Sequence, residues 1–129
     1  MNFENSYGVK DPRRLAQWFE HDDGGEFFIA PLDNTQHIEE QLKLVPAVGN
    51  DDSDESLYDA KIKSCEILAK TVLLDWKQVE DNKGNEIKYS DKIGLETLYQ
   101  FDEFRTWLVD NATKLRDDQQ KKKDAITKN

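Results

Sequence analysis

The sequence has few side chains suited to covalent or metal chemistry. Its 129 residues include one cysteine, Cys65, and two histidines, His21 and His37. A single cysteine excludes an intramolecular disulfide and is consistent with a reducing compartment. A zinc site needs clustered ligands, whereas these three residues lie on three different predicted elements. We therefore expect no metal site, and interpret them as a turn histidine, a helix-surface histidine and a packed core thiol.

Long apolar runs are also missing. No run approaches 18 residues, so we expect no transmembrane helix. The first 14 residues lack the apolar stretch of a secretory signal, and we expect the protein to stay in the cytosol in which it is made.

The sequence contains neither a P-loop nor a GxGxxG motif. Paired acids at 22–23, 39–40 and 117–118 occur where exposed acids are expected, so we predict no enzyme, no cofactor and no small-molecule substrate.

Positive charge is scarce relative to negative charge. Lysine and arginine number 18 against 27 acidic residues, which gives a net charge of −9. A basic face for nucleic acid is not expected from this balance. The acidic cluster at 51–55 and the segment 81–87 resemble parts of calcium loops. Both lack the full alternation of oxygen ligands, so we interpret them as a solvated loop and a plain turn.

The densest apolar content lies in residues 57–76, which we predict to form a long central helix. Its apolar residues recur at intervals typical of one broad helical stripe, and they are Leu57, Ile62, Cys65, Leu68, Ala69, Val72, Leu73 and Trp76. The end of this segment has almost no polar face. We expect that end to be buried from several sides, or against a partner.

A β-hairpin is predicted before the central helix. The strands are 17–20 and 26–30, the turn lies at 23–25, where glycine accepts a positive φ, and Pro31 ends the second strand. Large apolar residues occupy both faces of this hairpin, although one apolar face is enough for packing. Either the surplus forms a second contact surface, or the hairpin lies between helices. The candidate protein-binding residues are Trp18, Phe19, Phe27, Phe28, Ile29, Leu74 and Trp76.

Capping residues predict the other helices. Asp11 and Pro12 start a short one, and Asn34 caps a helix that Pro46 stops. Ser90 caps a helix over 91–100, and Asp102 caps a last helix over 103–115. The segment 82–85 is a turn between short strands at 79 and 87–89.

The predicted fold is α+β and mainly α. The N-terminal hairpin packs on three or four helices around the long central helix. We predict an N-terminal arm over 1–15, one domain over 16–115 and a polar tail over 116–129.

Three segments in order resemble the tail assembly chaperones of long-tailed bacteriophages. They are EFFIAPLDN at 26–34, after a strand and turn and before a helix; AKTVLLDW at 69–76, ending a later helix; and DNKGNEIKYS at 81–90, before two final helices. The resemblance covers roughly residues 16–115.

This resemblance implies a non-enzymatic protein of the bacterial cytoplasm that is not in the mature virion. It would bind the helical tape measure protein, keep it soluble, help to recruit tail tube subunits and self-associate. The alternative is an acidic DNA mimic or inhibitor of a host DNA-binding protein. Against that alternative, the acids are interleaved with 18 basic residues rather than aligned as a phosphate-like row.

Overall fold

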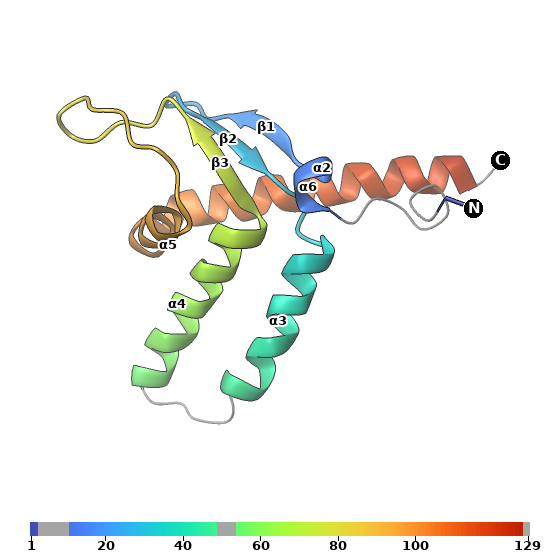
Figure 1. Cartoon of the computed structure of the whole chain (residues 1–129), viewed down its shortest axis with the longest axis horizontal. Helices are drawn as coiled ribbons and strands as arrows, with labels where there is room; N and C mark the ends of the chain where they lie inside the picture. Colours follow the sequence, from blue (N-terminus) through green and yellow to red (C-terminus); the bar gives the residue numbers. More distant parts are fainter. Residues whose placement is uncertain (3–10, 49–53, 128–129) are drawn as a thin grey trace.

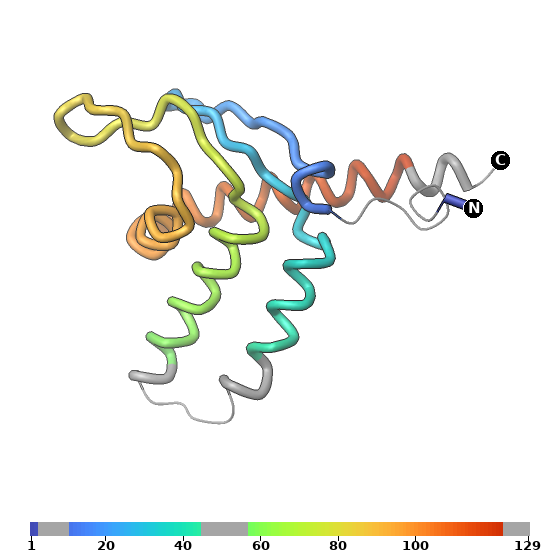
Figure 2. The backbone as a smooth tube through the Cα atoms, viewed as in Figure 1, coloured from blue at the N-terminus to red at the C-terminus, as the bar shows by residue number. Residues whose placement is uncertain are grey.

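The chain forms five helices and three strands within the residues that the computed structural model describes, which are 1–2, 11–48 and 54–127 (Figures 1 and 2). The helices are α2 Pro12–Leu15, α3 Thr35–Val48, α4 Asp54–Thr71, α5 Asp91–Gln100 and α6 Asp102–Thr127. The strands are β1 Gln17–Glu20, β2 Glu26–Ile29 and β3 Leu73–Lys77. They form one antiparallel sheet in the order β1-β2-β3. The predicted α+β, mainly α, fold is confirmed.

The sheet lies along the longest helix, with two helices projecting from it (Figure 1). α6 passes behind the sheet and continues beyond it. α3 and α4 run side by side away from the sheet and contact each other. α5 packs against α4 on the side opposite α3. We call α3 and α4 together the helical arm.

The core lies where the sheet, α4, α5 and α6 meet. The largest fully buried side chains come from all four of these parts of the fold and include Ile29, Leu73, Cys65, Leu98 and Leu108. Removal of apolar surface from water stabilises such a cluster by roughly 25 cal/mol per Å². Cys65 is buried within this cluster, so it is the packed core thiol that the sequence predicts.

The predicted hairpin is present with the expected turn. Gln17 pairs with Ile29 and Glu20 with Glu26. Gly24 and Gly25 have φ values of 90° and 83°, a conformation that costs glycine little because it has no Cβ. The hairpin is extended by a third strand that the sequence analysis assigned to a helix.

The predicted central helix over 57–76 is wrong at its C-terminal end. α4 stops at Thr71, and the next residues form β3, with Trp76 paired to Phe27. Strand pairing gives the backbone of this leucine- and tryptophan-containing run the hydrogen bonds that a longer helix would have supplied. The Asn34 side chain also donates to the carbonyl oxygen of Thr71 at 2.8 Å, at the end of the helix.

Other boundaries also differ from the prediction, including the end of α6, which is Thr127 rather than residue 115. α3 continues through Pro46 to Val48, although a proline was expected to stop it, and the structure offers no physical reason for this continuation. The segment after β3 forms a turn with one bridge, Glu80 to Glu86, rather than two short strands. The predicted caps Asp11, Asn34 and Ser90 are confirmed by side-chain bonds to the first turns of α2, α3 and α5.

Tyr89 attaches the start of α5 to the end of α4. Its hydroxyl lies within hydrogen-bond distance of the carbonyl oxygens of Ala69 and Leu73, the latter at 2.7 Å, and shares its single proton between them. Burial raises the pKa of this phenol above its ordinary value. A Cβ on Gly94 would lie 2.6 Å from the Tyr89 oxygen. Glycine at position 94 therefore permits the close approach of α5 to this ring, at some cost in helix propensity.

Candidate interaction surfaces

The sheet divides the predicted protein-binding residues between its two faces. Alternation along the strands places Phe19, Phe27, Ile29 and Trp76 on the face toward α6. The ring of Phe27 lies 5.0 Å from that of Phe104 and 5.4 Å from that of Trp107, centroid to centroid. These inward residues form core packing around α6.

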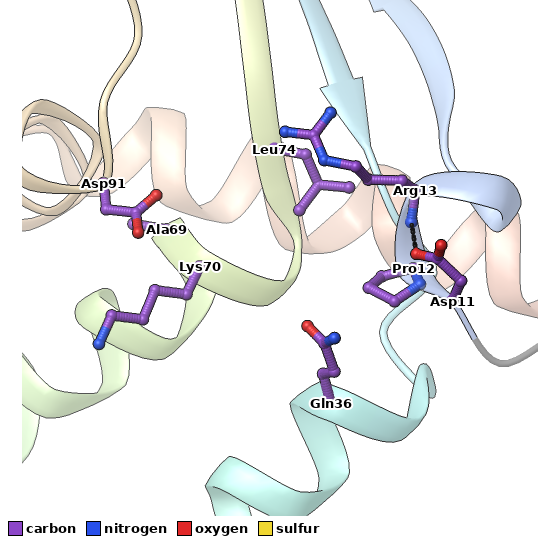
Figure 3. A pocket seen from close by; sticks show the side chains of 8 residues that line it. All are labelled: Asp11, Pro12, Arg13, Gln36, Ala69, Lys70, Leu74 and Asp91. Atoms are coloured by element: carbon purple, nitrogen blue, oxygen red, sulfur yellow. Dashed lines mark hydrogen bonds between the residues drawn. The ribbon is translucent and has the colours of Figure 1, made fainter.

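Leu74 occupies a separate place because the pairing of β2 with β3 is irregular between Phe28 and Ile29. Its buried side chain points toward α2 and lines a small pocket of about 140 Å³ (Figure 3). Arg13 and Gln36 lie in the same pocket wall, opposite Asp91. Lys70 also lines the pocket, but its ammonium binds Glu66 at 2.8 Å, so the acids and bases here form no single-sign ligand site.

Trp18 and Phe28 lie on the other face of the sheet, which we call the outer face. Their ring centroids are 5.1 Å apart, and 39% of Trp18 is exposed. The Nζ atom of Lys77 lies 4.1 Å from the Trp18 ring centroid, a cation–π contact. Of the seven predicted binding residues, these two share the outer face of the sheet.

Sequence reasoning did not select the exposed apolar residues of the helical arm. Ile38 and Leu42 follow each other by one turn on α3 and are 47% and 65% exposed. α3 contacts α4 through a different side, which includes His37 and Leu44. Ile38 and Leu42 lie on a different side of α3 from Leu44, and this second apolar side is a signal for a second contact that the sequence interpretation did not use.

His37 is buried, which corrects its assignment as a helix-surface histidine. It is 6% exposed, and its Nδ1 atom lies 3.0 Å from the hydroxyl of Thr71, near the end of α4. Burial lowers the pKa of His37, because the charged imidazolium loses hydration there. His21 instead packs on the ring of Trp107, at a centroid distance of 4.8 Å.

Within the described residues, no group of three or more histidine, cysteine or acidic side chains could hold a metal ion. The carboxylate of Asp81 instead accepts hydrogen bonds from the backbone of a turn. Its Oδ1 atom accepts from the backbone N–H groups of Asn85 and Lys83. These hydrogen bonds lower the pKa of Asp81 and close the predicted turn. The other candidate calcium segment, 51–55, lies largely outside the described residues.

No helix in the described part of the chain has the length and apolar content needed to cross a membrane. Some acidic side chains of the described surface form ion pairs with basic ones. Examples are Lys61 and Arg105 with Asp102, which lower the pKa of that carboxyl. Such pairing is unlike a continuous row of carboxylates.

Comparison with protein families identifies the origin of the chain. Residues 23–129 match the model of the YdaY prophage protein family. The match covers more than half of the chain, and the protein therefore belongs to this family and is derived from a phage. Searches of curated proteins and of solved structures found no match.

Proposed function

We propose that this protein is a non-enzymatic phage tail assembly chaperone that binds the tape measure protein and keeps it soluble. Its prophage family supports a role in a phage life cycle. As part of the proposal, the protein acts in the cytoplasm of the bacterial host, self-associates, helps to recruit tail tube subunits and is not in the mature virion. It needs no cofactor, small-molecule substrate, nucleic acid or membrane.

The observation that carries this proposal is the exposed apolar pair Ile38 and Leu42 on the helical arm. The resemblance implies a tape measure protein that is long, hydrophobic and mostly helical. Two apolar side chains one turn apart offer a ridge against which such a helix packs. Charged neighbours such as Glu39 and Lys43 keep the complex hydrated.

The two ion pairs on the helical arm favour the chaperone over the acidic DNA mimic. A mimic needs carboxylates arrayed without intervening cations. Here Glu66 is paired with Lys70, and Glu40 with Lys43. These pairs on the helical arm interrupt any phosphate-like row there.

The experiment is co-expression of the full chain with the protein encoded a short distance downstream, if that protein is very long and helical. We expect the long protein to stay soluble and to copurify. In the double variant Ile38→Gln/Leu42→Gln, binding should weaken about tenfold or more, because each lost apolar contact is worth roughly 1.5–3 kcal/mol when fully buried.

The matched control is Glu39→Gln/Lys43→Gln, which also leaves the net charge unchanged and alters exposed residues of the same helix. This control should bind like the natural chain. Precipitation of the long protein to the same extent with and without the chain would rule out the chaperone role. Equal weakening by both double variants would show that the apolar pair is not the contact.

A further inference from the structure

β1 presents an unpaired strand edge. It stands first in the order β1-β2-β3, and no described strand lies on its other side. The N–H of His21 donates to the carbonyl oxygen of Gly25. In an antiparallel ladder, hydrogen-bonded pairs recur at every second residue, so Phe19 and Gln17 also form hydrogen-bonded pairs with β2. The backbone N–H and C=O groups of Trp18 and Glu20 therefore point away from β2.

Negative charge is concentrated on the outer face next to this edge. Glu20 lies directly opposite Glu26 across β1 and β2, and like charges in that position are destabilising. Neither carboxylate forms an ion pair with another described residue. Lys77 is opposite Glu26 but places its ammonium over the ring of Trp18. A cation supplied from outside would relieve this repulsion.

We propose that an extended segment of a partner protein adds to β1 as a fourth, antiparallel strand. Its main chain bonds to the free N–H and C=O groups of Trp18 and Glu20, as in other cases of strand addition. On the outer face it places a lysine or arginine opposite Glu20 and an aliphatic residue opposite Trp18. Because alternate residues share a face, these two partner residues are two positions apart.

Charge argues against a second copy of this chain as the occupant. Each copy carries a net charge of −9. Symmetric pairing of two β1 strands would bring four carboxylates, Glu20 and Glu26 from each copy, onto one continuous outer face. A basic segment instead neutralises them.

This proposal goes beyond the chaperone function and does not rest on it. The contact uses β1 and extended main chain, whereas the proposed tape measure contact uses the exposed pair on α3. The Ile38→Gln/Leu42→Gln variant should therefore leave strand addition unchanged. A variant that loses tape measure binding but keeps strand addition, or the reverse, separates the two proposals.

The test uses the full chain and a fluorescent peptide, acetyl-Thr-Thr-Lys-Val-Leu-Thr-Thr-amide, in a polarisation titration. In antiparallel pairing the N–H groups of its lysine and leucine face β1, and that of its valine faces away. N-methylation of the lysine and leucine should weaken binding about tenfold or more, because two hydrogen bonds worth roughly 1 kcal/mol each are lost. N-methylation of the valine should have little effect.

Charge reversal provides the second arm. Glu20→Lys should abolish the preference for the lysine peptide over the same peptide with glutamate in its place. The control is Glu96→Lys, which makes the same charge change at an exposed site on α5. Circular dichroism checks that both variants fold, and the N-methyl comparison needs no variant of the protein.

Several results would overturn the proposal. They are equal binding of the two N-methylated peptides, equal effects of Glu20→Lys and Glu96→Lys, and the absence of any binding at millimolar peptide. Sedimentation of the free chain as a dimer that Glu20→Lys alters would place a second copy at this edge instead.

Discussion

At the residue scale, the hydrogen bonds around His37 indicate which ring nitrogen of its imidazole carries the proton. The hydroxyl of Thr71 donates its single proton to the carbonyl oxygen of Ile67 at 2.7 Å. It therefore accepts from Nδ1–H of His37, 3.0 Å away. The Nε2 atom is left as the acceptor, and the side-chain amide of Gln41 lies 3.5 Å from it. Burial, which lowers the pKa of His37, favours this neutral form with the proton on Nδ1.

This arrangement predicts a pH-dependent contribution to stability. Burial lowers the pKa of His37 in the folded protein below its ordinary value of 6.5. The unfolded chain then binds the proton more readily, so the free energy of unfolding rises with pH between the folded and ordinary values. The contribution is fully present above about pH 6.5 and is lost as pH falls toward the lowered pKa. Urea unfolding from pH 4.5 to 8 measures it.

The variant His37→Gln should remove this part of the pH dependence, since glutamine does not titrate. The control His21→Gln keeps the buried histidine and should retain it. If the natural chain and His37→Gln differ by the same free energy at every pH, the protonation argument is wrong. Burial of His37 could not be predicted from the sequence, because its partner Thr71 is 34 residues away.

At the element scale, Asn34 joins α3 to the end of α4. Its Oδ1 atom accepts from the N–H of His37 as an N-cap, and its Nδ2 atom donates to the carbonyl oxygens of Pro31 and Thr71, each at 2.8 Å. The residue is nearly completely buried. One side chain therefore both starts α3 and positions the root of the helical arm.

Replacement Asn34→Ala should lower the free energy of unfolding by about 2–4 kcal/mol, combining a lost cap with unpaired buried carbonyl groups. Urea unfolding measures the loss, and hydrogen exchange should show faster opening of α3 than of α6. Asn34→Asp keeps the cap acceptor but loses both donated bonds. If Asn34→Asp is as stable as the natural chain, the link to Thr71 contributes nothing.

The elements show what the sequence could predict. Local signals were sufficient for the hairpin, whose turn glycines require positive φ, and for the caps Asp11, Asn34 and Ser90. They were not sufficient at residues 72–76, where an apolar run fits a helix or a buried strand equally well. Pairing with β2, more than 40 residues earlier, decides that case. Without the pairing of β3 with β2, the sequence also could not show that the candidate binding residues are divided between the two faces of the sheet.

At the scale of the whole molecule, α6 connects parts of the chain that are distant in sequence. The N–H of Leu32, just after the hairpin of β1 and β2, donates to the carbonyl oxygen of Ala112. The side-chain amide of Gln119 donates to the carbonyl oxygen of Leu15, just before the hairpin. Leu115 is buried. The helix thus continues through the boundary predicted at residues 115 and 116, and it contacts the body of the protein at least as far as Gln119.

Two truncations test how far α6 supports the fold. A chain ending at Lys114 loses the buried side chain of Leu115 and the bond from Gln119, and we expect a loss of about 2–5 kcal/mol, as for removal of a large core side chain. A chain ending at Gln120 keeps both contacts and should remain within about 0.5 kcal/mol of the natural protein. Urea midpoints with unchanged m values measure both differences. If both truncations are equally destabilising, residues after Gln120 support the fold; if neither is, the contacts of Leu115 and Gln119 do not hold α6 to the body.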